Sequence, residues 1–204
     1  MRFPLSLTTS MAGYIAKNKI TGRKKFPLVL MLEPLHACNL TCTGCGRIRE
    51  YAPTIKEKLT VEECLASVDE AGAPIVNVHL DGLEKNHDIM VEREGVFQKA
   101  VAGIKAAKAR GHLVCTNTTI YKETDLAEID ELFGFLSSIG VDGFMVSPAY
   151  GYSAVHETNP EGAQEIFMTK KDIHEKFSAA QKLFAKHRMM SSPIYLDFLA
   201  GKRD

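Results

Sequence analysis

Short apolar runs alternate with helical patterns along this chain, and this alternation limits the fold more than any other feature. The apolar runs occupy residues 26–34, 74–80, 113–120 and 143–148. Apolar residues recur at helical spacing in 60–71, 95–110, 125–138 and 170–187. Strands that alternate with helices pair in parallel through right-handed crossovers. The sequence therefore predicts an α/β fold with a parallel sheet of alternating βα units, either open or curled toward a barrel.

Terminal signals support several of these helices. Thr60 followed by Glu63 is a capping-box pattern, in which each side chain bonds the other residue's backbone. Gly95 and Gly111 bracket another predicted helix, because glycine readily takes the backbone angles found at helix ends. Residues 194–199 predict either a last strand or a short helix.

The N-terminal segment is set apart from the alternating part. Residues 5–19 predict a helix, and five basic residues follow or end it: Lys17, Lys19, Arg23, Lys24 and Lys25. A basic run of this kind is either a solvated loop or a contact with anionic lipid at a membrane surface. We expect an N-terminal helix and basic segment at 1–26 and a single core domain at 27–204.

Composition and charge narrow the class of protein. The 204 residues carry 25 basic and 25 acidic side chains, so net charge favours no nucleic-acid partner. No apolar run approaches the roughly 20 residues of a membrane-spanning helix. The apolar start is too short for a signal peptide. The five cysteines are an odd number and three lie close together, which favours a reducing compartment and a cytoplasmic location. If the basic run binds anionic lipid, the protein would also contact the inner membrane surface.

Cys38, Cys42 and Cys45 have the spacing C-x3-C-x2-C and follow directly on the first predicted strand. Three neighbouring thiolates can hold three irons of a [4Fe–4S] cluster and leave the fourth iron open to an outside ligand. Structural zinc is the alternative, with Cys64 or His36 as the fourth ligand, although a second paired spacing is absent. Buried cysteines without any metal are the remaining interpretation.

The other two cysteines are predicted to pack in the core. Cys64 lies within a predicted helix and Cys115 within the third strand. If Cys115 faces the pocket, its thiol is a candidate hydrogen donor, a role that requires exposure.

The cysteine loop resembles that of the radical S-adenosylmethionine (SAM) enzymes, and the segment 32–46 resembles their hopanoid-biosynthesis branch, the adenosylhopane synthases. Further segments similar to this branch are 59–64, 79–83, 94–97, 104–111, 141–143, 147–152 and 196–201. The resemblance implies an incomplete radical SAM partial (β/α) barrel. It also implies a [4Fe–4S] cluster and SAM as cofactors, with Cys38, Cys42 and Cys45 as the iron ligands.

The same resemblance implies a reaction and its partners. A 5′-deoxyadenosyl radical, generated by reductive cleavage of SAM, adds to the alkene of a hydrophobic hopanoid, diploptene, and an electron donor such as flavodoxin or ferredoxin supplies the electrons. Asp81, Asn117 and Ser147 are then candidate SAM contacts, and Tyr150 and Tyr152 candidate walls for the apolar substrate. Each has a structural alternative: Asp81 can make a turn, Asn117 and Ser147 can cap strand ends, and the tyrosines can be surface aromatics.

One motif of the family is absent. Relatives carry Gly-Gly-Glu-Pro after the second strand, whereas here Ile75–Val78 pass directly into His79–Gly82. This junction predicts an internal deletion of two βα units, and the C-terminal end predicts a truncation. Three hypotheses follow: a radical SAM enzyme, a non-catalytic iron–sulfur or zinc-binding remnant of that family, or a damaged coding sequence.

Overall fold

The computed structural model describes residues 5–26, 52–54, 56–60, 62–63, 66–67, 75–151 and 167–203. These residues fall into two compact units. One contains 75–151 and 167–203, and the other contains 5–26 and the described residues from 52 to 67. The domain boundary expected at 26/27 stays a prediction, because 27–50 lie outside the described residues.

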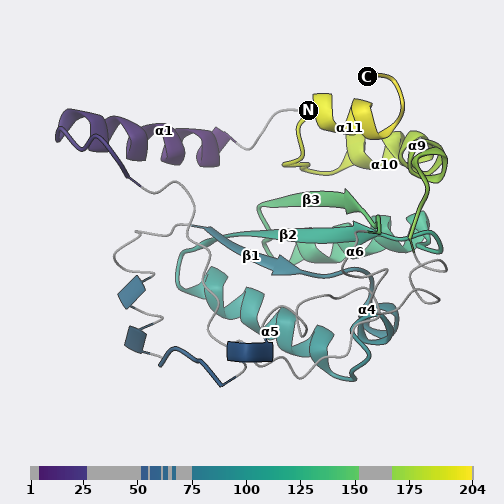
Figure 1. Ribbon diagram of the computed structural model, residues 1–204, viewed down its shortest axis with the longest axis horizontal. Coiled ribbons are helices and arrows are strands. Elements are labelled where there is room, and N and C mark those ends of the chain that lie inside the picture. Colours follow the sequence, from purple (N-terminus) through teal and green to yellow (C-terminus); the bar gives the residue numbers. More distant parts are fainter. Residues whose placement is uncertain are drawn as a thin grey trace. The chain divides into compact units, whose positions relative to one another are not determined.

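The larger unit is built on a three-stranded parallel sheet, shown in Figure 1. Its strands are β1 (Ile75–His79), β2 (Leu113–Ile120) and β3 (Gly143–Pro148), and their spatial order is their chain order. The register pairs Val78 with Thr116, and Thr118 with Val146. All three strands lie where the apolar runs predicted them.

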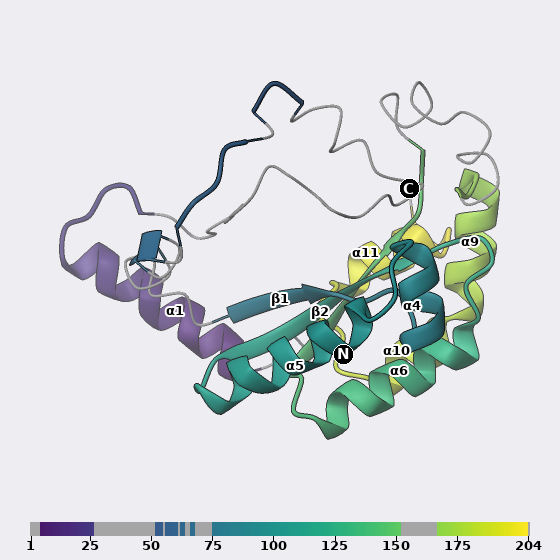
Figure 2. The same cartoon turned by 90° about the horizontal axis from the view of Figure 1, so that it is seen from below.

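Helices α5 (Val96–Ala109) and α6 (Leu126–Ser138) connect the three strands. Phe97 of α5 stacks on Phe135 of α6, and Phe133 of α6 stacks on Phe144 of β3 at 4.3 Å between ring centroids. The even-numbered residues of β2 from Val114 to Ile120 are buried. Because alternate strand residues share a face, these helices cover one face of the sheet, as Figures 1 and 2 show together.

The C-terminal part adds three helices and a short pairing beside β3. The predicted helix at 170–187 is two helices, α9 (Lys170–Ala179) and α10 (Gln181–Lys186), and the last segment is the helix α11 (Pro193–Leu199). Between α10 and α11 the chain runs parallel to β3: the Phe144 N–H donates to the Arg188 carbonyl, and the Met190 N–H to the Phe144 carbonyl. This segment extends the sheet at its β3 edge.

A short helix, α4 (Glu84–Met90), follows β1 and was not predicted from the sequence. Hydrogen bonds hold the chain on both sides of this helix. Asp88 accepts hydrogen bonds from the backbone N–H groups of Gly95 and Phe97, at 2.6 and 2.9 Å. Glu128 of α6 accepts the Leu83 N–H at 2.8 Å. These contacts fix the chain just after β1.

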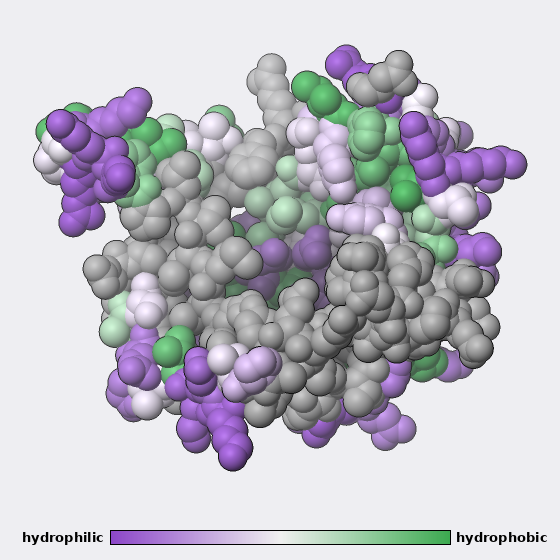
Figure 3. Space-filling view, viewed as in Figure 1, coloured by the Kyte–Doolittle hydropathy of each residue, from purple (hydrophilic) through white to green (hydrophobic). Residues whose placement is uncertain are grey.

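The smaller unit contains α1 (Leu5–Ile20), close to the helix predicted there, and the 3-10 turn η1 (Ala52–Thr54). The Thr60–Glu63 capping box is confirmed, with the Thr60 N–H donating to Glu63 at 2.8 Å and the Glu63 N–H to Thr60 at 3.1 Å. The five basic residues of the N-terminal run are exposed, and Figure 3 shows hydrophilic side chains over much of the α1 segment. In the described part of the chain, no helix is long and apolar enough to cross a membrane.

Candidate functional site

Polar side chains gather on the sheet face opposite α5 and α6, toward the carboxyl ends of the strands. The register places His79 beside Asn117, and Thr119 beside Ser147. Paired residues of parallel strands project to the same face, so these four side chains share one surface. The other face is buried beneath α5 and α6. Parallel α/β folds carry their ligand sites at the carboxyl ends of strands, so this polar surface is the candidate site.

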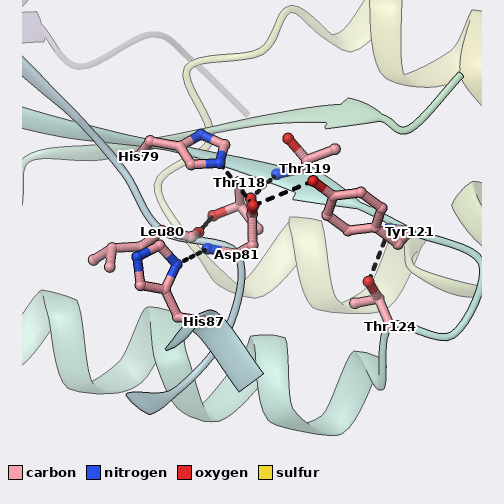
Figure 4. A network of polar contacts seen from close by, with 8 residues as sticks. All are labelled: His79, Leu80, Asp81, His87, Thr118, Thr119, Tyr121 and Thr124. Atoms are coloured by element: carbon pink, nitrogen blue, oxygen red, sulfur yellow. Dashed lines mark hydrogen bonds and ion pairs between the residues drawn. The ribbon is translucent and has the colours of Figure 1, made fainter. Parts of the chain in front are cut away.

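Asp81 stands just beyond the end of β1 and joins it to β2. Its carboxylate is only 2% exposed. One oxygen, Oδ1, accepts the Thr119 N–H at 2.7 Å, and the other, Oδ2, lies 2.7 Å from His79 Nε2 and 3.4 Å from the Tyr121 hydroxyl, which donates to it. Figure 4 shows the carboxylate at the centre of this network. A buried carboxylate is stable only when it is paired in this way.

His79 forms the outer half of an ion pair with Asp81. Its side chain is 47% exposed, while its Nε2 is held by the carboxylate. Burial of the ring opposes protonation and is the largest single influence on its pKa. The hydrogen bond and the negative charge of Asp81 together outweigh that influence, so the pKa of His79 is raised above its ordinary value. His79 therefore holds a proton more readily than a free histidine.

His87 of α4 is the inner histidine of the network. It is 1% exposed, and its Nδ1 accepts the backbone N–H of Asp81 at 3.2 Å. Because Nδ1 is an acceptor, the neutral ring carries its hydrogen on Nε2. Burial is the main cause that lowers the pKa of His87. This histidine is a neutral support for the strand end.

The backbone between β1 and β2 is tied at the same point. The Leu80 N–H donates to the Asn117 carbonyl at 3.0 Å, and Thr118 Oγ1 donates to the Leu80 carbonyl at 2.7 Å. Beyond Asp81, a side chain at Gly82 would lie 3.0 Å from a Glu128 carboxylate oxygen and 3.1 Å from Asn86 Cβ. Gly82 thus allows α4 and α6 to close around the loop that carries Asp81.

The structure brings together most of the predicted site residues that it describes. Asn117 and Ser147 are half-buried on the polar surface, and in the described part of the chain their side chains have no hydrogen-bond partner. Asp81 lies beside the same surface. Its contacts with His79, Thr119 and Tyr121 go beyond the turn-forming role considered as its alternative. Its role in binding, like that of Asn117 and Ser147, stays a prediction.

Cys115 lies on the same sheet face as Asn117, and it is 3% exposed. Burial raises the pKa of its thiol. Tyr150 is 62% exposed at the end of β3. Tyr152 and the ligand candidates Cys38, Cys42 and Cys45 lie outside the described residues, and so does Cys64.

Sequence reasoning missed His79, His87 and Tyr121. A signal for His79 was present, because residues two apart in an extended strand project to the same side and Asp81 follows at that spacing. The other two depend on α4 and on the turn after β2, which bring residues distant in sequence to the carboxylate.

Two sets of candidate side chains fit two different kinds of ligand. Among the described residues, no three histidine, cysteine or acidic side chains are placed to hold a metal ion. The half-exposed imidazole and the unpartnered Asn117 and Ser147 side chains fit a polar organic ligand with several hydrogen-bonding groups. The three clustered thiolates in the sequence fit an iron–sulfur cluster.

No family model and no curated protein matches the chain. Among solved structures, it resembles Streptococcus suis SuiB with a TM-score of 0.52 and 14% identity, covering 94% of this chain and 51% of SuiB. It also resembles SuiB bound to S-adenosylmethionine, with a TM-score of 0.50 and 14% identity over 91% of this chain and 49% of SuiB.

At this identity the likeness shows the fold alone, and the chain spans about half the length of SuiB. The predicted α/β fold class is confirmed: the described strands form a parallel sheet of alternating βα units.

Proposed function

We propose that this chain is a radical SAM protein that cleaves SAM reductively at a [4Fe–4S] cluster and transfers the 5′-deoxyadenosyl group to a hopanoid alkene. The observation that carries the proposal is the C-x3-C-x2-C spacing of Cys38, Cys42 and Cys45 in a chain with this fold. When bound, the cluster and SAM supply the one-electron chemistry that side chains lack.

The residues of the chain contribute binding and shielding in this proposal. The three cysteines hold the cluster, while Asn117 and Ser147 present hydrogen-bonding groups to SAM from the polar surface. The half-buried side chains of both residues, on the polar surface and without a hydrogen-bond partner among the described residues, support this role. Tyr150 and Tyr152 form the wall for the apolar hopanoid, which favours aromatic surface over water.

Cys115 is the proposed hydrogen donor to the carbon radical formed on the substrate. Its raised pKa keeps the thiol protonated at neutral pH, and a thiol must hold its S–H bond to give up a hydrogen atom. The thiyl radical then returns to the thiol by taking one electron from a flavodoxin- or ferredoxin-type donor and one proton. The 3% exposure of Cys115 counts against this role, since a hydrogen donor has to contact the carbon radical.

Anaerobic reconstitution tests the proposal. We expect about four irons and four sulfides per chain, and 5′-deoxyadenosine or its hopanoid adduct after incubation with SAM, diploptene and dithionite. Replacing Cys38, Cys42 and Cys45 with alanine should abolish iron binding, whereas Cys64→Ala, the matched control, should retain it. Iron content unchanged in the triple variant would refute the ligand assignment.

A second candidate function is a non-catalytic iron–sulfur or zinc-binding protein. The absence of Gly-Gly-Glu-Pro between Ile75 and Gly82 favours it, since that motif engages SAM in the family that the chain resembles. Metal analysis combined with calorimetric titration of SAM separates the two functions. Bound metal with no SAM affinity supports this second function, and SAM cleavage excludes it.

A further inference from the structure

Asp81 is too buried for its oxygens to meet a ligand. Its carboxylate is 2% exposed, Oδ1 is occupied by the Thr119 N–H, and Oδ2 by His79 and Tyr121. His79, by contrast, is 47% exposed, and in the described part of the chain its Nδ1 has no hydrogen-bond partner. In Figure 4 this second ring nitrogen points away from the carboxylate. The group that can meet a ligand is therefore the imidazole.

We propose that His79 and Asp81 form a proton-linked binding pair, in which the imidazolium of His79 donates through Nδ1 to an oxygen of SAM and Asp81 keeps the ring in that form and orientation. The pair rests on the proposed function for the identity of the ligand. In this pair His79 is the contacting residue and Asp81 is a positioning residue.

The surroundings of His79 determine which way its charge responds to pH. Asp81 favours the protonated ring, and the neighbouring His87, whose ring centroid is 6.4 Å away, opposes it when charged. His87 is itself kept neutral by burial, and Tyr121 reaches the pair through its hydroxyl. The pKa of His79 is raised, so ligand binding is strongest below that pKa and weakens as the pH rises through it.

The ligand oxygen belongs to one of two parts of SAM. The methionyl part carries a carboxylate, and the nucleoside part carries ribose hydroxyls, and either accepts a hydrogen bond from an imidazolium. Competition separates them. If the carboxylate is the acceptor, methionine binds to the full chain with the same pH dependence as SAM; if ribose is, 5′-deoxyadenosine does so.

The pair itself is tested by NMR titration of the histidine side chains in the 204-residue chain, without any ligand. The pKa of His79 should lie above its ordinary value and should fall in Asp81→Asn, since the asparagine removes the negative charge but keeps an oxygen for Thr119. The His112 titration serves as the internal control, because this residue precedes the opposite end of β2. An unchanged His79 pKa in Asp81→Asn would overturn the pairing.

Calorimetric titration with SAM tests the binding role. We expect His79→Asn to bind SAM about tenfold more weakly near about pH 6.5 and to lose the pH dependence, because a charge-assisted hydrogen bond disappears. Asp81→Asn should bind weakly near about pH 8 and recover toward about pH 6, where its histidine becomes protonated. His112→Asn should match the wild type, and thermal melts establish that each variant is folded.

The failures can be told apart. Wild-type protein that binds no SAM at any pH overturns the proposed function and, with it, the ligand in this inference. Wild-type protein that binds SAM with no pH dependence, or a folded His79→Asn variant that binds as tightly as wild type, overturns the inference alone.

Discussion

Two threonines of β2 differ in a single hydrogen bond. Thr116 and Thr118 are both fully buried on the face covered by α5 and α6. Thr118 Oγ1 donates to the Leu80 carbonyl, whereas Thr116 Oγ1 has no partner in the described part of the chain. A buried hydroxyl without a partner is a cost to the folded state, since it gives up its bonds to water.

We therefore expect opposite effects from the same substitution at these two sites. Thr116→Val removes the unpaired hydroxyl and should raise the free energy of unfolding by about 1 kcal/mol. Thr118→Val should lower it by about 1–2 kcal/mol, because the Leu80 carbonyl loses its partner. Urea unfolding of both variants checks this, and a change of the same sign in both would contradict it.

At the scale of single residues, the sequence predicted position better than role. Asp81 was expected at a strand end near the site, and it lies there, but its burial and its bonds to His79 and Thr119 depend on the pairing of β1 with β2. Side-chain environments of this kind arise from non-local contacts, which spacing along the chain does not contain.

At the scale of elements, Gly143 controls how closely the 188–190 segment approaches β3. A Cβ at this position would lie 2.6 Å from Met190 Cγ and 3.3 Å from the Arg188 carbonyl oxygen. The Phe144 N–H bond to that same carbonyl requires the close approach. A side chain here would have to move Met190 and strain the pairing.

Gly143→Ala should lower the free energy of unfolding by about 1–3 kcal/mol, the usual range for added volume at a packed site. Gly134→Ala is the matched control: Gly134 is exposed in α6 with nothing within 4 Å of an added Cβ. The control should raise the free energy by about 0.5–1 kcal/mol, since alanine favours a helix interior. Denaturant unfolding measures both, and a neutral Gly143→Ala would refute the close approach.

Strands and long helices were predictable because their signals are local. β2 and β3 have the predicted bounds, and α6 begins one residue after the predicted start, with Asp125 as its N-cap. The short α4 was missed because its stability comes from Asp88 and Glu128, each bonded across a loop or to another helix. The division between α9 and α10 at Ala180 was also missed, since neither glycine nor proline marks it.

At the scale of the whole molecule, the parallel order of the strands followed from the alternation of strands and helices. The added pairing of 188–190 with β3 did not, because residues 188–190 lack the length and apolar pattern of a strand. The grouping of the described residues from 52 to 67 with 5–26 in one unit was not predicted either, since contacts rather than composition define it. Cys38, Cys42 and Cys45 lie outside the described residues, so their place in the site rests on the sequence alone.

Three carboxylates of the larger unit accept hydrogen bonds that hold the fold, and these bonds lower their pKa values. In Asp88 the main cause is the hydrogen bond from the Phe97 backbone, and in Asp172 it is the bond from the Thr169 backbone. In Asp130 it is the bond from Lys186, with His187 as the second donor. A carboxyl whose folded pKa is below its unfolded value stabilises the fold above the unfolded pKa, and this contribution is lost as the pH falls through the folded pKa.

The protein should therefore lose stability below about pH 4, where the unfolded chain takes up protons that the folded carboxylates resist. Replacing Asp88, Asp130 and Asp172 together with asparagine should lower the free energy of unfolding at neutral pH and flatten its decline in acid, because the charged acceptors are gone. Urea unfolding at a series of pH values measures both slopes. The two curves should converge as the pH falls, since protonated aspartates in the wild type then resemble the asparagines. Parallel curves down to about pH 2.5 would mean that these carboxylates do not cause the acid sensitivity.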